Sequence, residues 1–296
     1  MKKLLVLVIL VAAGAWWITA PQGLPDSAVP DHAPDLANGE RVFNAGGCAS
    51  CHGQVVEGRP QRAVMAGGLE MSTPAGLFRA PNISPDPDHG IGRWSALEFL
   101  NAMQRGVSPE GRHYYPAFPY TSYSRTSATD LLDLKGYLSS LPASDNDVGP
   151  HELAFPYSLS RGLGLWKRLY LNDEPQVTLT GYSEQLARGQ YLVEGPTHCG
   201  ECHTPRNFAQ AMDTSRWLSG AAYAGGEGRV PGIDLGRSSF AAWSKDDIAY
   251  YLETGVDPDF DVVGGSMASV VDNLSRLPVE DREAIAAYLK ALPAPE

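Results

Sequence analysis

All four cysteines of this chain lie in a five-residue pattern that occurs twice. Residues 48–52 read Cys-Ala-Ser-Cys-His, and residues 199–203 read Cys-Gly-Glu-Cys-His. C-x-x-C-H is typical of covalent attachment of a c-type haem. Two thiols three positions apart share one face of a helical turn and can bond both vinyl groups of one haem, while the histidine becomes the proximal iron ligand. The pattern therefore predicts two covalently bound haem c groups, attached at Cys48, Cys51, Cys199 and Cys202, with His52 and His203 on the irons.

Other uses of paired cysteines fit less well. The pairs of a structural zinc site usually lie about 15–20 residues apart, whereas here about 150 residues separate them. A thioredoxin-like motif needs no histidine after the second cysteine and expects a βαβ surrounding. A disulfide framework belongs to much smaller secreted domains. Two haems are the favoured interpretation.

Length and charge limit the class of protein. A chain of 296 residues has room for about two domains. The formal net charge of −11 argues against nucleic acid as a partner, because no basic patch is present to neutralise phosphates. An acidic surface instead favours docking to a basic face of a redox partner.

The N-terminus has the form of an export signal. Lys2 and Lys3 precede an uncharged run over residues 4–20. A cleavage site at residues 13–15 (Ala-Gly-Ala) would leave a soluble periplasmic protein, but the run exceeds the usual 7–15 residues of a signal core. Trp16 and Trp17 near its end resemble an interfacial aromatic belt. We therefore expect a retained membrane anchor that places the remainder on the periplasmic side of a bacterial inner membrane, by the positive-inside rule.

After a Pro-rich linker the chain repeats a set of landmarks. Trp94-Ser95 lies twelve residues before Gly106, and Trp243-Ser244 lies twelve residues before Gly255. Each half closes with a predicted helix that ends at a Leu-Pro step. We predict an all-α fold of two tandem haem domains joined by a helical linker, with an N-terminal hydrophobic helix. The predicted segments are an anchor at 1–22, a linker at 23–35, domain 1 at 36–144, an interdomain linker at 145–182 and domain 2 at 183–296.

The interdomain linker contains a predicted amphipathic helix over residues 157–171. Arg161, Lys167 and Arg168 are expected on its polar side. The favoured interpretation is a connecting helix that holds the domains together. A contact surface for a partner is the alternative.

The repeat also predicts the second axial ligand of one haem. An electron-transfer haem often has methionine as its sixth ligand. Met267 stands twelve residues after Gly255 in a Gly-rich segment, so it is the predicted sixth ligand of the second haem. The same count from Gly106 reaches Phe118, and phenylalanine cannot bind iron.

Three alternatives therefore stay open above the first iron. His113, five residues before Phe118, would give a bis-histidine haem of lower potential. Met65 or Met71 could supply a sulfur ligand, whereas Met103 lies in a predicted helix and is expected in the core. The third alternative is a vacant, five-coordinate iron.

Several longer motifs carry a family resemblance. Residues 199–207 (Cys-Gly-Glu-Cys-His-Thr-Pro-Arg-Asn), 81–86 (Pro-Asn-Ile-Ser-Pro-Asp), 90–95 (Gly-Ile-Gly-Arg-Trp-Ser) and 286–290 (Ala-Ala-Tyr-Leu-Lys) resemble the multihaem cytochrome c subunits of bacterial membrane-associated dehydrogenases. Alcohol, gluconate and aldehyde dehydrogenases have such subunits. The resemblance implies class I cytochrome c domains that pass electrons from a dehydrogenase to the respiratory chain. This chain departs from the family in two ways. Those subunits generally carry three haems, whereas this chain has two attachment motifs. The family also has methionine in a Pro-Ala-Met-Pro-Tyr run, and this chain has Phe118 at that position.

The predicted function is electron transfer without substrate chemistry. The expected donor is a dehydrogenase, and the expected acceptor is a downstream cytochrome, a quinone or an oxidase. The alternative is a peroxidase-like dihaem enzyme that uses an open first iron. That chemistry needs acid–base groups on the distal side, where the sequence offers no convincing cluster beyond His113 itself.

Overall fold

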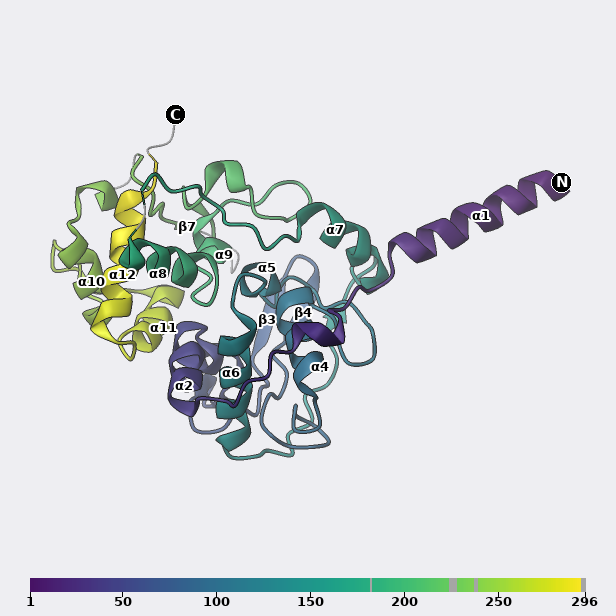
Figure 1. Ribbon diagram of the computed structural model, residues 1–296, viewed down its shortest axis with the longest axis horizontal. Helices are drawn as coiled ribbons and strands as arrows, with labels where there is room; N and C mark the ends of the chain where they lie inside the picture. The colour runs from purple at the N-terminus through teal and green to yellow at the C-terminus, as the bar shows by residue number, and fades with distance from the viewer. Residues whose placement is uncertain (182, 224–227, 237–238, 294–296) are drawn as a thin grey trace.

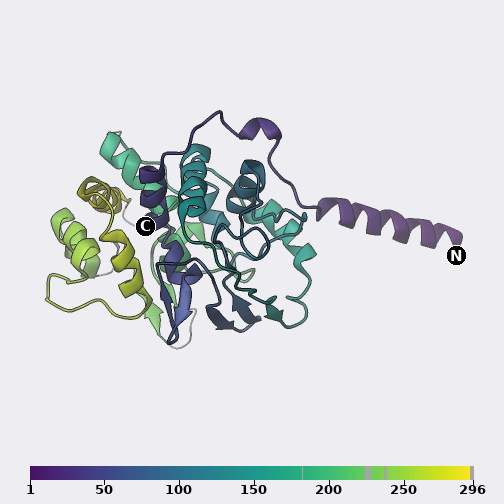
Figure 2. The same ribbon diagram turned by 90° about the horizontal axis from the view of Figure 1, so that it is seen from below.

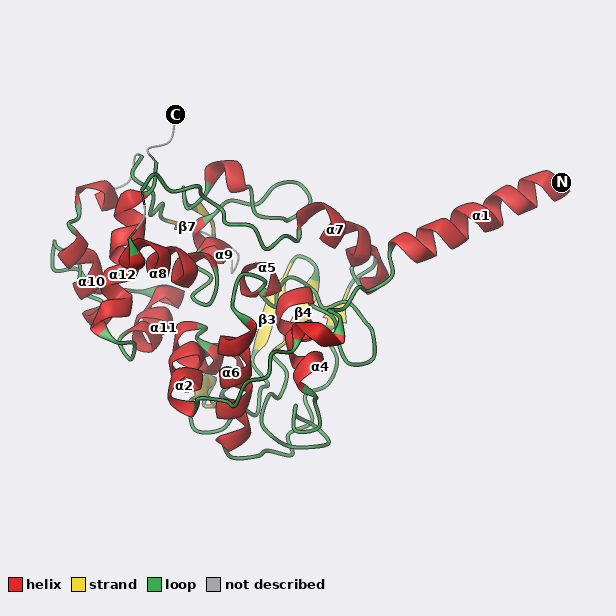
Figure 3. Ribbon diagram, in the orientation of Figure 1, coloured by secondary structure: helices red, strands yellow, loops and turns green. Residues whose placement is uncertain are grey.

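The computed structural model describes residues 1–181, 183–223, 228–236 and 239–293. Helices account for most of the regular structure in these residues (Figure 1, Figure 3). The α-helices are α1 (Lys2–Ile18), α2 (Leu36–Ala45), α3 (Cys48–His52), α4 (Ala96–Leu100), α5 (Tyr120–Tyr123), α6 (Ala128–Ser140), α7 (Leu163–Tyr170), α8 (Glu184–Glu194), α9 (Gly200–His203), α10 (Lys245–Thr254), α11 (Gly265–Leu274) and α12 (Val279–Ala291). Single 3₁₀ or π-helical turns lie at Asp26–Ala28, Asn101–Arg105, Ser160–Gly162, Thr214–Arg216 and Ser239–Ala242.

The prediction of an all-α fold was incomplete, because short antiparallel strands are also present. They are β1 (Gln54–Val56), β2 (Arg59–Gln61), β3 (Glu70–Thr73), β4 (Gly76–Arg79), β5 (Glu152–Leu153), β6 (Ala221–Ala222) and β7 (Arg229–Val230). They pair as β1-β2, β3-β4-β5 and β6-β7, with Met71 opposite Phe78 and Leu77 opposite Glu152. Strands of two to four residues are too short to show an alternating hydrophobic pattern, so the sequence carried no signal for them.

Each half of the chain contains two helices that cross at a glycine. In the first half (residues 36–142) α2 packs on α6, and in the second half (residues 183–292) α8 packs on α12. A Cβ atom on Gly39 would lie 2.2 Å from the Asp133 carbonyl oxygen, and one on Gly189 would lie 1.9 Å from that of Ala284. Only glycine permits backbones to approach so closely. The matching glycines therefore mark the same helix crossing in both halves.

The repeated Trp-Ser landmark is the start of a helix. Ser95 caps α4 and Ser244 caps α10, each in a capping box with the acidic side chain three residues later. Both helical segments end at a left-handed glycine, Gly106 (φ 58°) and Gly255 (φ 74°). In the first half the last turn before the glycine is π-helical. The equal spacing of the landmarks thus reflects one local structure formed twice.

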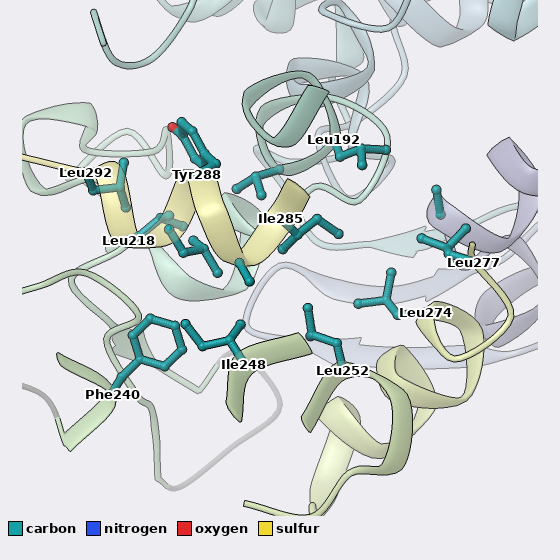
Figure 4. Close-up of a cluster of buried hydrophobic side chains, with 14 of the residues drawn as sticks. Leu192, Leu218, Phe240, Ile248, Leu252, Leu274, Leu277, Ile285, Tyr288 and Leu292 are labelled. Carbon is teal, nitrogen blue, oxygen red and sulfur yellow. The ribbon is translucent and has the colours of Figure 1, made fainter. Parts of the chain in front are cut away.

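Each half has its own hydrophobic core. The core of the second half gathers around α12. Its residues Ile285, Tyr288, Leu289 and the following Leu292 are buried, and Figure 4 labels three of them, Ile285, Tyr288 and Leu292. The core of the first half includes Phe43, Leu100, Met103 and Leu131. Met103 is therefore a core residue, as predicted.

The two linkers pack against the haem-domain halves of the chain, whereas α1 does not. Residues 21–35 run along the first half (Figure 2), where the Leu24 backbone N–H donates to Asn101 at 2.6 Å. The predicted helix at 157–171 forms as a 3₁₀ turn followed by α7. Helix α1 projects away from the rest of the molecule (Figure 1). Among the described residues, no helix combines the length and the apolar character needed to cross a membrane.

Candidate haem sites

The two C-x-x-C-H motifs form one-turn helices, α3 and α9, after a residue in the left-handed region. That residue is Gly47 (φ 58°) before the first motif and His198 (φ 42°) before the second. No disulfide joins the four cysteines, so every sulfur atom of the two motifs is available for attachment to a haem vinyl group.

Each motif histidine is oriented by a backbone carbonyl. Nδ1 of His52 lies 2.8 Å from the Pro81 oxygen, and Nδ1 of His203 lies 2.8 Å from the Pro231 oxygen. Because a carbonyl can only accept, Nδ1 carries the proton in both rings and Nε2 is left as the lone-pair nitrogen. Burial lowers the pKa of both imidazoles, against the opposing effect of the carbonyl, and so favours the neutral form that binds metal. A second-sphere carbonyl of this kind is what an iron-ligating histidine requires, so the residues fit the predicted haems.

The segments beside the histidines also match between the halves. The His52 carbonyl accepts from the Gly67 N–H at 2.8 Å, and the His203 carbonyl accepts from the Gly220 N–H at 2.7 Å. The Met65 carbonyl accepts from the Ile83 N–H, as the Leu218 carbonyl does from the Ile233 N–H. Met65 is thus the counterpart of Leu218, and both are fully buried. This pairing places Met65 next to the segment that orients His52.

Matching contacts set the register of the two predicted sixth-ligand segments. Val107 bridges to His113 in the first half, and Val256 bridges to Val262 in the second. The residue after each bridge donates to the landmark glycine: Tyr114 to Gly106 and Val263 to Gly255, both at 2.7 Å. His113 is therefore the counterpart of Val262. Five residues further on, Phe118 is the counterpart of Met267, in agreement with the count from the sequence.

The two segments differ in what their side chains contact. Met267 lies in the first turn of α11 and packs against the second core. Phe118 packs edge-on against Tyr114 and Tyr120, with ring centroids at 6.0 and 6.4 Å. His113 is buried, its Nε2 lies 3.0 Å from the Thr19 carbonyl, and its Nδ1 has no hydrogen-bond partner among the described residues. Iron ligation by His113 remains a prediction, and ligation through Nε2 would require this nitrogen to leave Thr19.

The two haem sites meet through reciprocal contacts between the halves. Ser50, inside the first motif, accepts a hydrogen bond at 2.8 Å from Asn273 of α11, the helix that carries Met267. Glu201, inside the second motif, accepts from Thr121 at 2.5 Å and from Ser122 at 3.0 Å. Both hydroxyls belong to α5, which begins two residues after Phe118. Each motif helix therefore touches the helix beside the other half's predicted distal segment.

Glu201 is a buried carboxylate at this interface. Burial by itself would raise the pKa of its carboxyl group, but the Arg206 guanidinium at 2.5 Å and the Thr121 hydroxyl outweigh that effect, and the pKa falls below its ordinary value. The side chain is therefore charged. It holds α9 against α5 with charge-assisted hydrogen bonds, which are stronger than neutral ones.

Comparison with known proteins agrees with this geometry. The cytochrome c family model matches residues 36–142. A protein of Cereibacter sphaeroides named as a diheme cytochrome c-type protein is 47% identical, over 99% of this chain and 97% of the relative. The chain belongs to the dihaem c-type cytochromes. It binds two covalent haem c groups and functions in electron transfer.

Longer relatives share a related region with this cytochrome. The fructose dehydrogenase cytochrome subunit of Gluconobacter japonicus is 34% identical over 89% of this chain and 54% of the relative. A nicotinate dehydrogenase subunit of Pseudomonas putida is 40% identical over 87% of this chain and 21% of the relative. The cytochrome thus spans about half of the first relative and a fifth of the second.

Sequence reasoning missed several residues that shape the two sites. Pro81 and Pro231 had an available signal, because each begins a Pro-x-Ile sequence that occurs once in each half. Glu201 and Asn273 had none. Their partners lie 80 and 223 residues away, and Glu201 stands where the first motif has Ser50.

Proposed function

We propose that this cytochrome consists of two tandem class I cytochrome c domains, at residues 36–144 and 183–296. His52 and His203 are the proximal iron ligands, and Met267 is the sixth ligand of the second haem. The matched helix crossings, caps, proline carbonyls and bridges of the two halves support a duplicated domain. When bound, each haem iron takes up and releases one electron. The chain's own residues hold the two haems in fixed positions and set their surroundings.

Electrons pass between the two haems inside the chain. The observation that carries this proposal is the reciprocal contact of Ser50 with α11 and of Glu201 with α5. These hydrogen bonds join the attachment turn of each haem to the helix beside the other. Electron transfer depends steeply on distance and needs no moving side chain, so a rigid interface is the appropriate scaffold.

The donor is a dehydrogenase subunit, and the acceptor is a downstream cytochrome, a quinone or an oxidase of the respiratory chain. Relatives named as cytochrome subunits of fructose, alcohol and gluconate dehydrogenases support a dehydrogenase partner. The protein works on the periplasmic side of the bacterial inner membrane, to which the exposed apolar side chains of α1 attach it. Electrons enter at the first haem if its potential is the lower one, as bis-histidine ligation by His113 would make it.

A peroxidase function is not favoured. Phe118, the counterpart of Met267 in the first half, lies within a cluster of tyrosine rings. Such rings supply neither a strong acid nor a strong base near neutral pH, because burial raises the pKa of Tyr114, Tyr120 and Tyr123 still further.

Axial ligation is tested by electron paramagnetic resonance of the oxidised protein. Met267→Ala should convert one haem from low spin to high spin, and His113→Ala should do the same to the other if His113 is its ligand. Phe118→Met is the converse substitution. It places a methionine at the position that corresponds to Met267 and should give the first haem a spectrum like that of the second. A low-spin spectrum unchanged by Met267→Ala would overturn the assignment of the second haem.

Electron exchange between the haems is tested at Glu201. Glu201→Ala removes the contacts to Thr121 and Ser122, so the equilibration of electrons between the haems after flash photoreduction should slow. Glu283→Gln, which removes a charge from an exposed position, serves as the control. Equal rates in wild type, Glu201→Ala and the control would contradict the proposed route through this interface.

A further inference from the structure

Helix α7 and the turn before it expose an unusual number of large apolar side chains. These are Phe155, Tyr157, Leu159, Leu165 and Leu169, and we call them the apolar patch. Leu165 is 50% exposed and Leu169 is 66% exposed, although both lie in a regular helix. A helix that connects two soluble domains normally turns its leucines inward. Leu165 and Leu169 lie one turn apart on the same face of α7, and apolar exposure concentrated in this way marks a contact surface.

One basic residue of α7, Lys167, points the other way, into the protein. Lys167 is only 8% exposed, and its ammonium group donates to the carbonyls of Arg105 at 2.7 Å and Gly106 at 2.6 Å. The same group lies over the Tyr120 ring, 4.6 Å from its centroid. The sequence predicted Lys167 on the outer, polar side, and that prediction was wrong because these partners are contributed by the first half. The cost of burying Lys167 is thus met by internal contacts, which leave the leucines outside.

The apolar patch adjoins the end of α1. Arg161 donates to the Trp16 carbonyl at 2.6 Å, and Arg168 donates to the Ile18 carbonyl at 2.7 Å. Gly164 packs so closely that a Cβ atom there would lie 2.3 Å from the Thr19 oxygen. Figure 1 shows α7 beside the base of α1. The end of α1, a helix whose apolar side chains are exposed, is therefore fixed against the helix that carries the apolar patch.

The charged residues of this region differ in sign from those that dominate the rest of the chain. Residues 154–172 contain Arg161, Lys167 and Arg168 and no acidic residue, in a chain whose net charge is −11. The guanidinium of Arg161 lies over the Trp16 ring, 4.0 Å from its centroid. Exposed leucines and aromatic rings together with arginine, without carboxylates, are the composition of a surface that lies against anionic phospholipid.

We infer that the apolar patch contacts the surface of the phospholipid bilayer, with its leucines between the headgroups and the acyl chains. This inference rests on the membrane attachment proposed above and adds a second contact to it. If α1 were the only attachment, the haem domains could swing about the end of that helix. A second contact at α7, fixed to the first half through Lys167, would hold the first haem domain at a set height and orientation above the membrane.

Spin labels on the full-length, haem-loaded protein test this inference in vesicles of phosphatidylethanolamine and phosphatidylglycerol. Cysteine variants at Leu165 and Leu169 report on the apolar patch. Variants at Phe260 and Val262, which are 85% and 76% exposed in the second half, are matched controls. Collisions of a spin label with oxygen indicate that the label lies in lipid, and collisions with a water-soluble nickel complex indicate that it lies in solvent. The oxygen-to-nickel ratio should be several-fold higher at 165 and 169 than at 260 and 262.

The outcomes separate the two proposals. If the protein does not float with the vesicles, membrane attachment and the apolar-patch contact are both overturned, while electron transfer between the haems stands. If it floats but all four labels give the same ratio, only the patch contact is overturned. Labels at 165 and 169 that are shielded from both reagents would also overturn it and would indicate a protein partner. Dipolar coupling between such labels would identify that partner as a second copy.

Discussion

Replacing Gly189 by alanine should strongly destabilise the second half, although it adds only one methyl group. The new Cβ would lie 1.9 Å from the Ala284 oxygen, 2.7 Å from its carbonyl carbon and 2.8 Å from the Tyr288 Cβ. Real Cβ contacts are rarely below 3.0 Å, so α8 and α12 would have to separate by about 1.1 Å. Because the nearest clash is with backbone, no change of side-chain rotamer can relieve it.

The expected magnitude follows from two opposing contributions. Overpacking of this kind typically costs 1–3 kcal/mol, and a backbone clash belongs at the upper end, about 3 kcal/mol. Alanine recovers about 1 kcal/mol of helix propensity relative to glycine. The free energy of unfolding should therefore fall by about 2 kcal/mol.

Guanidinium unfolding of the haem-loaded protein measures this change, and hydrogen exchange locates it. Faster exchange is expected in peptides from α8 and α12, with little change in α2 and α6. Gly162→Ala is the control, because its Cβ would meet nothing within 4 Å and its backbone is already helical. A free energy of unfolding for Gly189→Ala within about 0.5 kcal/mol of wild type would refute the account of this crossing.

Three further predictions concern other parts of the molecule. Gly39→Ala should weaken the first half in the same way, with faster hydrogen exchange in α2 and α6, because its Cβ would lie 2.2 Å from the Asp133 oxygen. Asn273→Ala removes the bond to Ser50 and should slow electron exchange between the haems without altering the spectrum of either haem. Burial lowers the pKa of Lys167 to about 7, below the ordinary value of 10.5 that applies to the unfolded chain. The unfolded chain therefore binds more protons between these values, and the free energy of unfolding should rise with pH by at most about 1.4 kcal/mol per unit. Lys167→Met should lack that component of the pH dependence, and identical pH profiles would contradict it.

Much of each haem site follows from local sequence. Five consecutive residues place two thiols and an imidazole on one helical turn, so the attachment sites needed no tertiary information. The capping serines and left-handed glycines act over a few residues, which is why counting from Gly106 and Gly255 aligned Phe118 with Met267. The closing helices were equally local, because each was predicted from its end at a Leu-Pro step.

What the tertiary structure alone decided depends on partners that are distant in the chain. Glu201 meets Thr121 across 80 residues, and Asn273 meets Ser50 across 223. No short pattern encodes such pairs, because they exist only after the two halves have packed together. Lys167 shows the same limit: its charge predicted an outward position, but the carbonyls of residues 105 and 106 offered it a buried one. The sequence by itself therefore determined which groups the chain holds. The packing of the halves decided how the two sites meet and which side of α7 is turned outward, since both depend on contacts that span the whole chain.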